Sequence, residues 1–165
     1  MARFGFFQSG WHATLIDEAD NVAQMPDAAI ERVTTAEAMD DFPAAYVAGW
    51  DVAPSWSDQF KSNVRPWLHE PGWALYLARV EGQPAAAAIL YIQDDVGYLA
   101  DAATDPAYAR LGLHAALLRR RMQDAHDARA EFVCSGADFL STSHRYMERA
   151  GMRLLFMRAI WTQLG

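Results

Sequence analysis

The residues best suited to chemistry lie at positions 104–118 and read Thr-Asp-Pro-Ala-Tyr-Ala-Arg-Leu-Gly-Leu-His-Ala-Ala-Leu-Leu. We interpret this stretch as the end of a strand, a tight glycine-containing turn and the first turns of a helix. Amide groups at a helix start have no partner inside the helix, and the helix dipole adds positive potential there. An anion such as a phosphate group is therefore well placed at this turn. An ordinary strand-to-helix connection is the alternative that the turn alone leaves open.

The composition bounds the class of protein. A chain of 165 residues fits one domain with a sizeable core, and 52% hydrophobic with 21% charged residues is typical of a globular protein. The net charge of −7 argues against nucleic-acid binding, because phosphates favour basic surfaces, and it is compatible with a cationic substrate.

Cysteine and histidine usage narrows the chemistry further. Cys134 is the one cysteine, which excludes an internal disulfide and fits a reducing compartment, and we expect it to be an inert core residue. The histidines show no metal-ligand spacing, so we predict no metal site. No apolar run reaches the roughly 18 residues that span a membrane. Residues 1–15 also lack the apolar core of a signal peptide, so we expect a cytoplasmic protein without membrane contact.

The first 28 residues form an N-terminal extension of uncertain role. Its aromatic side chains are too apolar for a free tail, so we expect the segment to pack on something: Phe4, Phe6, Phe7 and Trp11. We interpret residues 12–16 as a strand and residues 17–27 as a linker.

Helical signals follow a short predicted strand at 30–33. Thr34 and Glu37 form a capping-box pattern for a helix that runs toward Gly49, and Pro43 is expected to bend or split it. Ser55 marks the start of a second helix, whose apolar residues recur at helical spacing.

From residue 73 the pattern becomes that of strands. We predict antiparallel strands at 73–80, 84–92 and 96–103, because short turns join them. A long helix is predicted over 107–129, with a buried stripe of Leu111, Ala115, Leu118, Met122 and Ala125, and with residues 119–121, Arg-Arg-Arg, on a solvated face.

The chain after this helix returns to the sheet. A strand at 131–135 should run parallel to the strand at 96–103, because a helix connects the two. Ser141 or Thr142 caps a short helix that ends at Gly151, and residues 153–162 form the last strand.

This order of elements, together with residues 73–161, resembles the GCN5-related N-acetyltransferase (GNAT) superfamily. In that superfamily an Arg/Gln-x-x-Gly-x-Gly/Ala turn at the start of the long helix binds the pyrophosphate of acetyl-CoA. Pro106, Tyr108 and Gly112 match the typical motif, whereas Ala109 and His114 replace its first arginine and its last glycine. Because such a turn binds through backbone amides, the resemblance implies cofactor-binding residues in the turn and the helix start: Ala109, Arg110, Leu111, Gly112, Leu113, His114 and Ala115. It also implies cofactor contacts on the strand before the turn, at Ala102, Ala103 and Thr104.

A second run, at residues 143–152, resembles the Ser-x-Arg-Asn-x-x-Arg-x-Gly-Phe pattern of one branch of the superfamily. It implies that Ser143 contacts the cofactor. Many members place a tyrosine that acts as general acid at the position that Met147 occupies here. Tyr146 precedes that position by one residue and is our candidate for this role, although one residue turns about 100° around a helix.

The resemblance implies direct attack of an amine on the thioester in a ternary complex. A backbone amide near residues 102–104 polarises the carbonyl. Asp101 is the candidate base, and strand alternation predicts that either Asp101 or Ala102 faces the cleft, not both. Glu131, Asp138 and water are the other candidates.

We therefore expect an α/β acyl-CoA N-acyltransferase fold at 29–165, with a mixed, mostly antiparallel sheet that splays between strands 96–103 and 131–135. The implied function is acetyl transfer from acetyl-CoA to a small-molecule or protein amine. A catalytically weak or inactive acyl-CoA-binding module is the alternative. An interaction protein on the same fold, with a homodimer formed through the aromatic N-terminal segment and the last strand, is the third reading.

Overall fold

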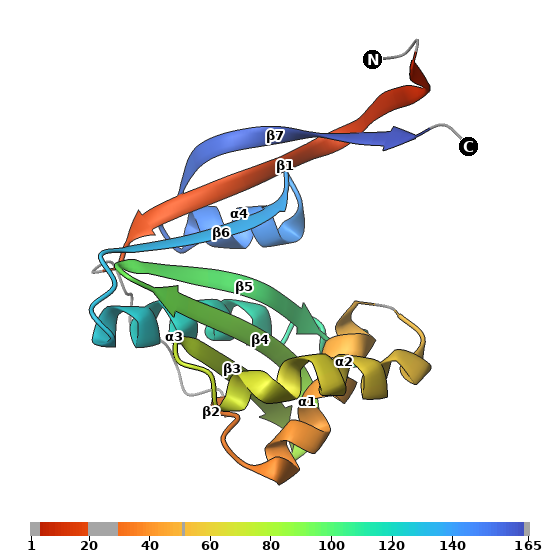
Figure 1. Ribbon diagram of the computed structural model, residues 1–165, viewed down its shortest axis with the longest axis vertical. Coiled ribbons are helices and arrows are strands. Elements are labelled where there is room, and N and C mark those ends of the chain that lie inside the picture. Colours follow the sequence, from red (N-terminus) through yellow and green to blue (C-terminus); the bar gives the residue numbers. More distant parts are fainter. Residues whose placement is uncertain (1–3, 20–29, 51, 164–165) are drawn as a thin grey trace.

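The computed structural model describes residues 4–19, 30–50 and 52–163. One seven-stranded sheet has the order β2-β3-β4-β5-β6-β1-β7 (Figure 1). Its strands are β1 (Phe6–Glu18), β2 (Ile30–Arg32), β3 (Trp73–Val80), β4 (Gln83–Gln93), β5 (Val96–Thr104), β6 (Phe132–Asp138) and β7 (Arg153–Gln163). Neighbouring strands are antiparallel except β5 and β6, which are parallel. The mixed, mostly antiparallel sheet is as predicted.

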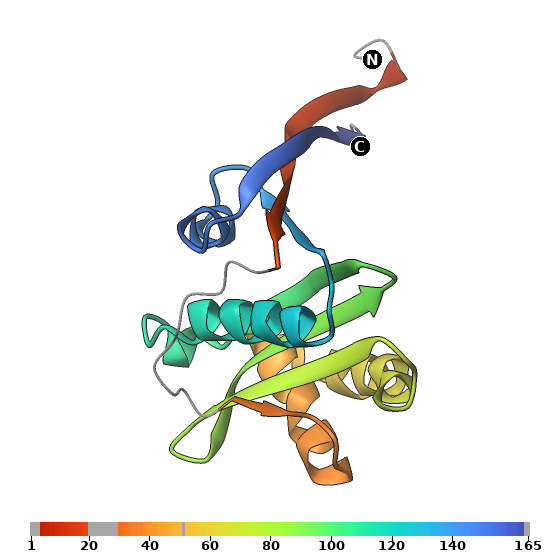
Figure 2. The same cartoon turned by 90° about the vertical axis from the view of Figure 1, so that its left-hand side faces the viewer.

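β1 is first in the sequence but lies between β6 and β7 in the sheet. It contains the predicted strand at 12–16 and extends it on both sides. The strand includes the first two residues of the predicted linker, and positions 20–27 of that linker lie outside the described residues. β1 and β7 continue together as a two-stranded ribbon that leaves the rest of the sheet (Figure 2). The aromatic start of the chain is thus integral to the sheet.

Helices cover both faces of the sheet. The helices are α1 (Ala36–Gly49), α2 (Ser57–Val64), α3 (Leu113–Asp127) and α4 (Thr142–Arg149). Leu75, Leu77 and Ile89 pack under α1, whereas Tyr76 and Leu90 pack in the core that contains α3. Strands buried on both faces have nearly continuous apolar sequences, as residues 85–90 do. Within the described ranges, no helix combines the length and the apolar character needed to cross a membrane.

The first helix begins one residue later than the capping-box prediction. Thr35, not Thr34, is its N-cap, and the Thr35 side chain accepts a hydrogen bond from the Ala38 amide at 3.2 Å. Pro43 does not split the helix, which runs on to Gly49. The buried side of the helix, which includes Phe42, holds it against the sheet.

The long helix is shorter than predicted and has a different buried face. A 3₁₀ turn over Pro106–Tyr108 and left-handed backbone at Arg110 and Gly112 delay its start to Leu113. Leu118, Met122 and Ala125 are buried as predicted. Leu111 precedes the helix and is 58% exposed, so the buried side is instead completed by Leu113, Ala116, Leu117 and Arg121.

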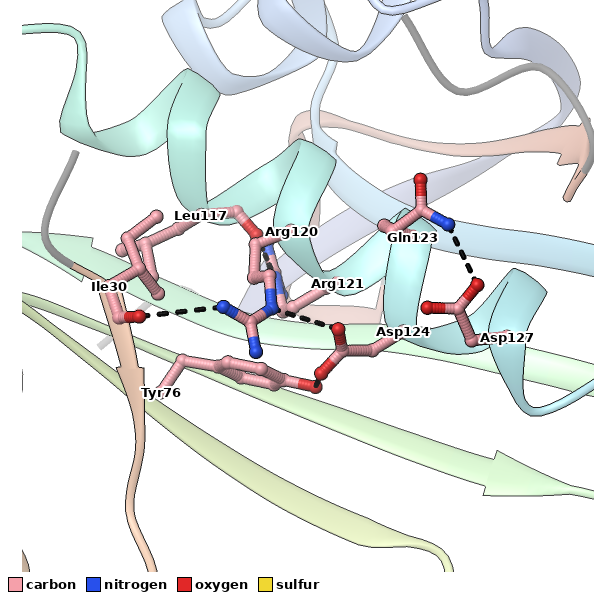
Figure 3. A network of polar contacts seen from close by, with 8 residues as sticks. All are labelled: Ile30, Tyr76, Leu117, Arg120, Arg121, Gln123, Asp124 and Asp127. Atoms are coloured by element: carbon pink, nitrogen blue, oxygen red, sulfur yellow. Dashed lines mark hydrogen bonds and ion pairs between the residues drawn. The ribbon is translucent and has the colours of Figure 1, made fainter. Parts of the chain in front are cut away.

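The three adjacent arginines of α3 do not share one solvated face. Each residue turns about 100° around a helix, so neighbours point in different directions. Arg120 pairs with Asp124 at 2.8 Å and donates to the Ile30 carbonyl (Figure 3). Arg121 points into the core and is only 1% exposed. Only a structure distinguishes the buried arginine from its neighbours.

Candidate active site

The site lies where β5 and β6 separate. The two strands pair only from Val96 opposite Phe132 to Tyr98 opposite Cys134. One residue further on, the Ser135 hydroxyl donates a 2.7 Å hydrogen bond to the Leu99 carbonyl. Beyond this link the strands diverge, which confirms the predicted opening. Cys134 is half-buried, and burial raises the pKa of its thiol, which makes it a poor nucleophile.

A β-bulge interrupts β5 just beyond that link. Ala88 pairs with Ala102 and Leu90 pairs with Leu99, so Ala100 and Asp101 together oppose the single residue Ile89. Further along, the Asp105 amide donates to the Ala85 carbonyl, so the backbone of Asp105 faces β4. Strand alternation then turns the backbone groups of Ala102 and Thr104 toward the opening. The bulge therefore determines which backbone amides of β5 point toward the opening between β5 and β6.

The first of two cavities, here called the turn cavity, lies beside the turn between β5 and α3 and has a volume of about 410 Å³. It brings together most of the residues predicted to bind the cofactor, with the candidate acid Tyr146. Leu111 and Ala115 do not line it. Its lining is Gly49, Trp50, Ala102, Ala103, Thr104, Tyr108, Ala109, Arg110, Gly112, Leu113, His114, Thr142, Ser143 and Tyr146.

The backbone of this turn suits an anion. Arg110 and Gly112 have φ angles of 68° and 78°, and Gly112 is the N-cap of α3. A Cβ atom on Gly112 would meet nothing within 4 Å, so the space in front of the helix start is open. Left-handed backbone at a residue other than glycine costs about 1 kcal/mol, and such strain gathers at functional sites. The turn thus offers amides, a helix dipole and the Arg110 charge to one ligand.

The second cavity, here called the strand cavity, lies between β5 and β6 and has a volume of about 360 Å³. Asp101 and Ala102 both line it, contrary to the prediction of either one, because the bulge breaks the alternation of β5. Asp138 also lines it, whereas Glu131 lies outside both cavities. Trp50, Ala102, His114 and Ser143 line both cavities, so the two spaces meet at these residues.

Asp101 has a partner that sequence reasoning missed. The Tyr46 hydroxyl donates a 2.8 Å hydrogen bond to the Asp101 carboxylate. The Tyr46 ring is fixed by stacking on Phe60, with ring centroids 3.9 Å apart. Burial and the Asp101 carboxylate together raise the pKa of Tyr46, so its hydroxyl keeps its proton. The carboxylate is thereby held at the wall of the strand cavity.

His114 lies beside Tyr146, with ring centroids 5.5 Å apart. Burial lowers the pKa of His114 to about 4, and the nearby Arg121 charge adds to this effect. The imidazole is therefore neutral at pH 7, and its buried Nε2 has no hydrogen-bond partner. His114 thus adds no positive charge at the helix start.

Residues 13–148 match the model of the acetyltransferase (GNAT) domain family. The chain belongs to this GNAT family. No curated protein matches the sequence.

Solved structures share the fold of this GNAT chain. Over 99% of the chain, it superposes on a GCN5-related N-acetyltransferase from Sphaerobacter thermophilus with a TM-score of 0.75 and 16% identity. A GCN5-related N-acetyltransferase from Kribbella flavida superposes on 99% of the chain with a TM-score of 0.70 and 20% identity. A functionally unknown conserved protein from Staphylococcus epidermidis superposes on 99% of the chain with a TM-score of 0.74 and 17% identity. The chain spans 55%, 62% and 65% of these three structures, respectively.

Several lining residues of the GNAT domain carry no local sequence signal. A Cβ atom on Gly49 would lie 2.6 Å from the Ala103 Cβ and 2.7 Å from the Thr104 nitrogen, so α1 ends in direct contact with β5. This contact places Trp50 over the junction of the two cavities. Gly136 similarly leaves room for the His12 ring, which a Cβ atom would approach to 2.4 Å.

Proposed function

We propose that this GNAT domain transfers an acetyl group from acetyl-CoA to an amine. One observation carries the proposal. A cavity beside the turn at the start of α3 meets a second cavity, whose wall holds a carboxylate, at Trp50, Ala102, His114 and Ser143. This arrangement allows two reactants to enter from different sides and to meet, which is what direct transfer requires.

In this proposal the turn cavity holds the donor. The pyrophosphate binds the amides of residues 110–114, and the Arg110 side chain adds the charge that Ala109 lacks. The chain of the cofactor that leads to the thioester lies along the open edge of β5, at Ala102, Ala103 and Thr104. The Ala102 amide faces this opening and polarises the thioester carbonyl.

The strand cavity holds the amine in this proposal. The neutral amine attacks the thioester carbonyl carbon, a C–N bond forms and the C–S bond breaks. Asp101 accepts the amine proton, directly or through water, and Tyr146 donates a proton to the departing thiolate. Asp101 lines the strand cavity and Tyr146 lines the turn cavity, so the two groups approach the junction from opposite sides. The acceptor is a small-molecule or a protein amine.

A two-part experiment tests this function. A thermal shift with acetyl-CoA measures binding, and release of free CoA thiol across a panel of amines measures transfer. We expect stabilisation by acetyl-CoA together with amine-dependent thiol release. Stabilisation without release for any amine favours an acyl-CoA-binding module, whereas no stabilisation at millimolar acetyl-CoA contradicts both functions.

We further propose that a second copy of the chain pairs with β7. This strand is an edge of the sheet, and it exposes apolar side chains on both faces, including Leu155, Phe156 and Trp161. An unprotected apolar edge of this kind is a template for pairing with another strand. Antiparallel pairing of β7 with its own copy is self-complementary, as a two-fold dimer requires.

A further inference from the structure

Arg121 is the most deeply buried cation that the described part of the chain contains. It lines the strand cavity, and the proposed transfer assigns it no chemical step. Burial lowers its pKa to about 10, so the guanidinium remains charged at neutral pH. A charge in a core persists only where hydrogen bonds compensate the lost water. The acceptors of the hydrogen bonds that Arg121 donates therefore indicate its structural role.

The bonds of Arg121 converge on the bulge of β5. Its Nη1 donates at 2.9 Å to the Ile89 carbonyl and at 2.9 Å to the Ala100 carbonyl. Its Nε donates at 3.1 Å to the Leu117 carbonyl, one turn earlier in α3 (Figure 3). Ile89 and Ala100 belong to the bulge itself, where one residue of β4 opposes two of β5. Arg121 therefore ties the bulge to the helix that begins at the anion-binding turn.

A bulge leaves backbone groups without ladder partners. The bond from Arg121 to the Ile89 carbonyl is buried and the bond to the Ala100 carbonyl is part-buried. An unpaired carbonyl away from water is unfavourable. The Arg121 guanidinium donates to both carbonyls. On the other edge of β5, Ser135 holds the Leu99 carbonyl at the point where β6 diverges. The bulge is thus held from both sides within three residues of Ala102.

We propose that Arg121 is a positioning residue that holds the β5 bulge and so aims the Ala102 amide at the thioester carbonyl. This inference rests on the proposed acetyl transfer. Without the bulge, alternation along β5 would turn the backbone of Ala102 toward β4 and away from the opening. Arg121 also lines the strand cavity but not the turn cavity. Its loss should therefore change the rate of transfer more than the affinity for the donor.

The test compares Arg121→Met with Arg120→Met. The second variant removes a neighbouring arginine of the same helix, with its Asp124 pair, and touches neither bulge carbonyl. Amide hydrogen exchange of residues 99–103 is measured on the unliganded proteins, and kcat and KM for acetyl-CoA are measured with the best amine of the panel.

We expect faster exchange at residues 99–103 in Arg121→Met only. We also expect its kcat to fall about 10²-fold, the effect of losing one carbonyl-polarising donor, with a change in KM below about threefold. Arg121→Lys keeps a cation within reach of a carbonyl, so it should recover part of both losses. This variant also keeps the test open if the methionine variant does not fold.

Two outcomes distinguish a failure of the proposed role of Arg121 from a failure of the proposed acetyl transfer. Unchanged exchange in Arg121→Met, or an unchanged kcat beside faster exchange, overturns the role of Arg121 and leaves the transfer reaction standing. A wild-type protein without turnover overturns the reaction and with it the catalytic part of the inference.

Discussion

The Tyr46 hydroxyl donates a 2.8 Å hydrogen bond to the Asp101 carboxylate across 55 residues of sequence. The bond joins α1 to the bulge of β5, the two elements that flank the junction of the cavities. It holds the carboxylate at the wall of the cavity that we propose for the amine. A base must lie within hydrogen-bond reach of the proton that it removes, and a fixed carboxylate satisfies this condition best.

Asp101→Asn should lower kcat for amine acetylation by about 10²- to 10⁴-fold, the range typical of a lost general base. Its affinity for acetyl-CoA should be unchanged, because Asp101 does not line the turn cavity. The asparagine oxygen can still accept from Tyr46, so folding is preserved. Steady-state kinetics and calorimetric titration check both expectations, with Tyr46→Phe as the matched variant that keeps the carboxylate. Equal activity of Asp101→Asn and wild type would assign proton removal to another group or to water.

Gly112→Glu should abolish the stabilisation by acetyl-CoA, because it places bulk and negative charge in front of the proposed pyrophosphate-binding turn. The left-handed backbone also makes any side chain at this position unfavourable, by about 1 kcal/mol. Gly82→Glu is the control, since Gly82 has a φ of 80° and equally open surroundings but lies in the turn between β3 and β4. Thermal shifts measured with and without acetyl-CoA separate the two effects. If Gly112→Glu still bound the donor, the turn would not be the pyrophosphate site.

His114 should make the free energy of unfolding depend on pH. Its pKa in the folded protein is about 4, below the ordinary 6.5. Between these values the unfolded chain takes up a proton that the folded chain does not, so stability rises as pH increases from about 4 to 6.5. The contribution is at most about 3 kcal/mol.

Denaturant unfolding of wild type and His114→Gln at several pH values measures this contribution. The difference in unfolding free energy between the two proteins should change through the pH window from about 4 to 6.5 and stay constant above it. A difference that does not vary with pH would show that the imidazole titrates normally.

Leu155→Lys should convert a dimer into a monomer. Leu155 is 54% exposed near the start of β7, and a lysine on an edge strand opposes pairing by its charge. Light scattering after gel filtration should give twice the 18.4 kDa chain mass for wild type and a single mass for the variant. Trp56→Lys, at an exposed position outside the ribbon, should leave the dimer intact. A monomeric wild type would contradict pairing through β7.

Periodic and turn signals predicted most of the fold. The alternation and short turns from residue 73 predicted the meander, and the crossover helix predicted that β5 and β6 are parallel. The position of β1 between β6 and β7 was not predictable, because long-range pairing has no local signal.

The site was partly predictable in the same way. The motif at 104–114 indicated which residues gather at the turn, because sequence neighbours stay together. Tyr46 and Arg121 were missed, since each acts on β5 from a helix far away in sequence. The bulge was also missed, and with it the reason why Asp101 and Ala102 line the same cavity. A bulge adds one residue to a strand and so reverses which side the following residues face. It leaves no signal in the local composition.

The most direct test of this account is the structure of the protein crystallised with CoA. We predict the pyrophosphate within hydrogen-bond distance of the amides of residues 110–114, and the thiol at the junction lined by Trp50, Ala102, His114 and Ser143. A CoA molecule bound elsewhere, or a turn cavity empty at saturating CoA, would contradict the account.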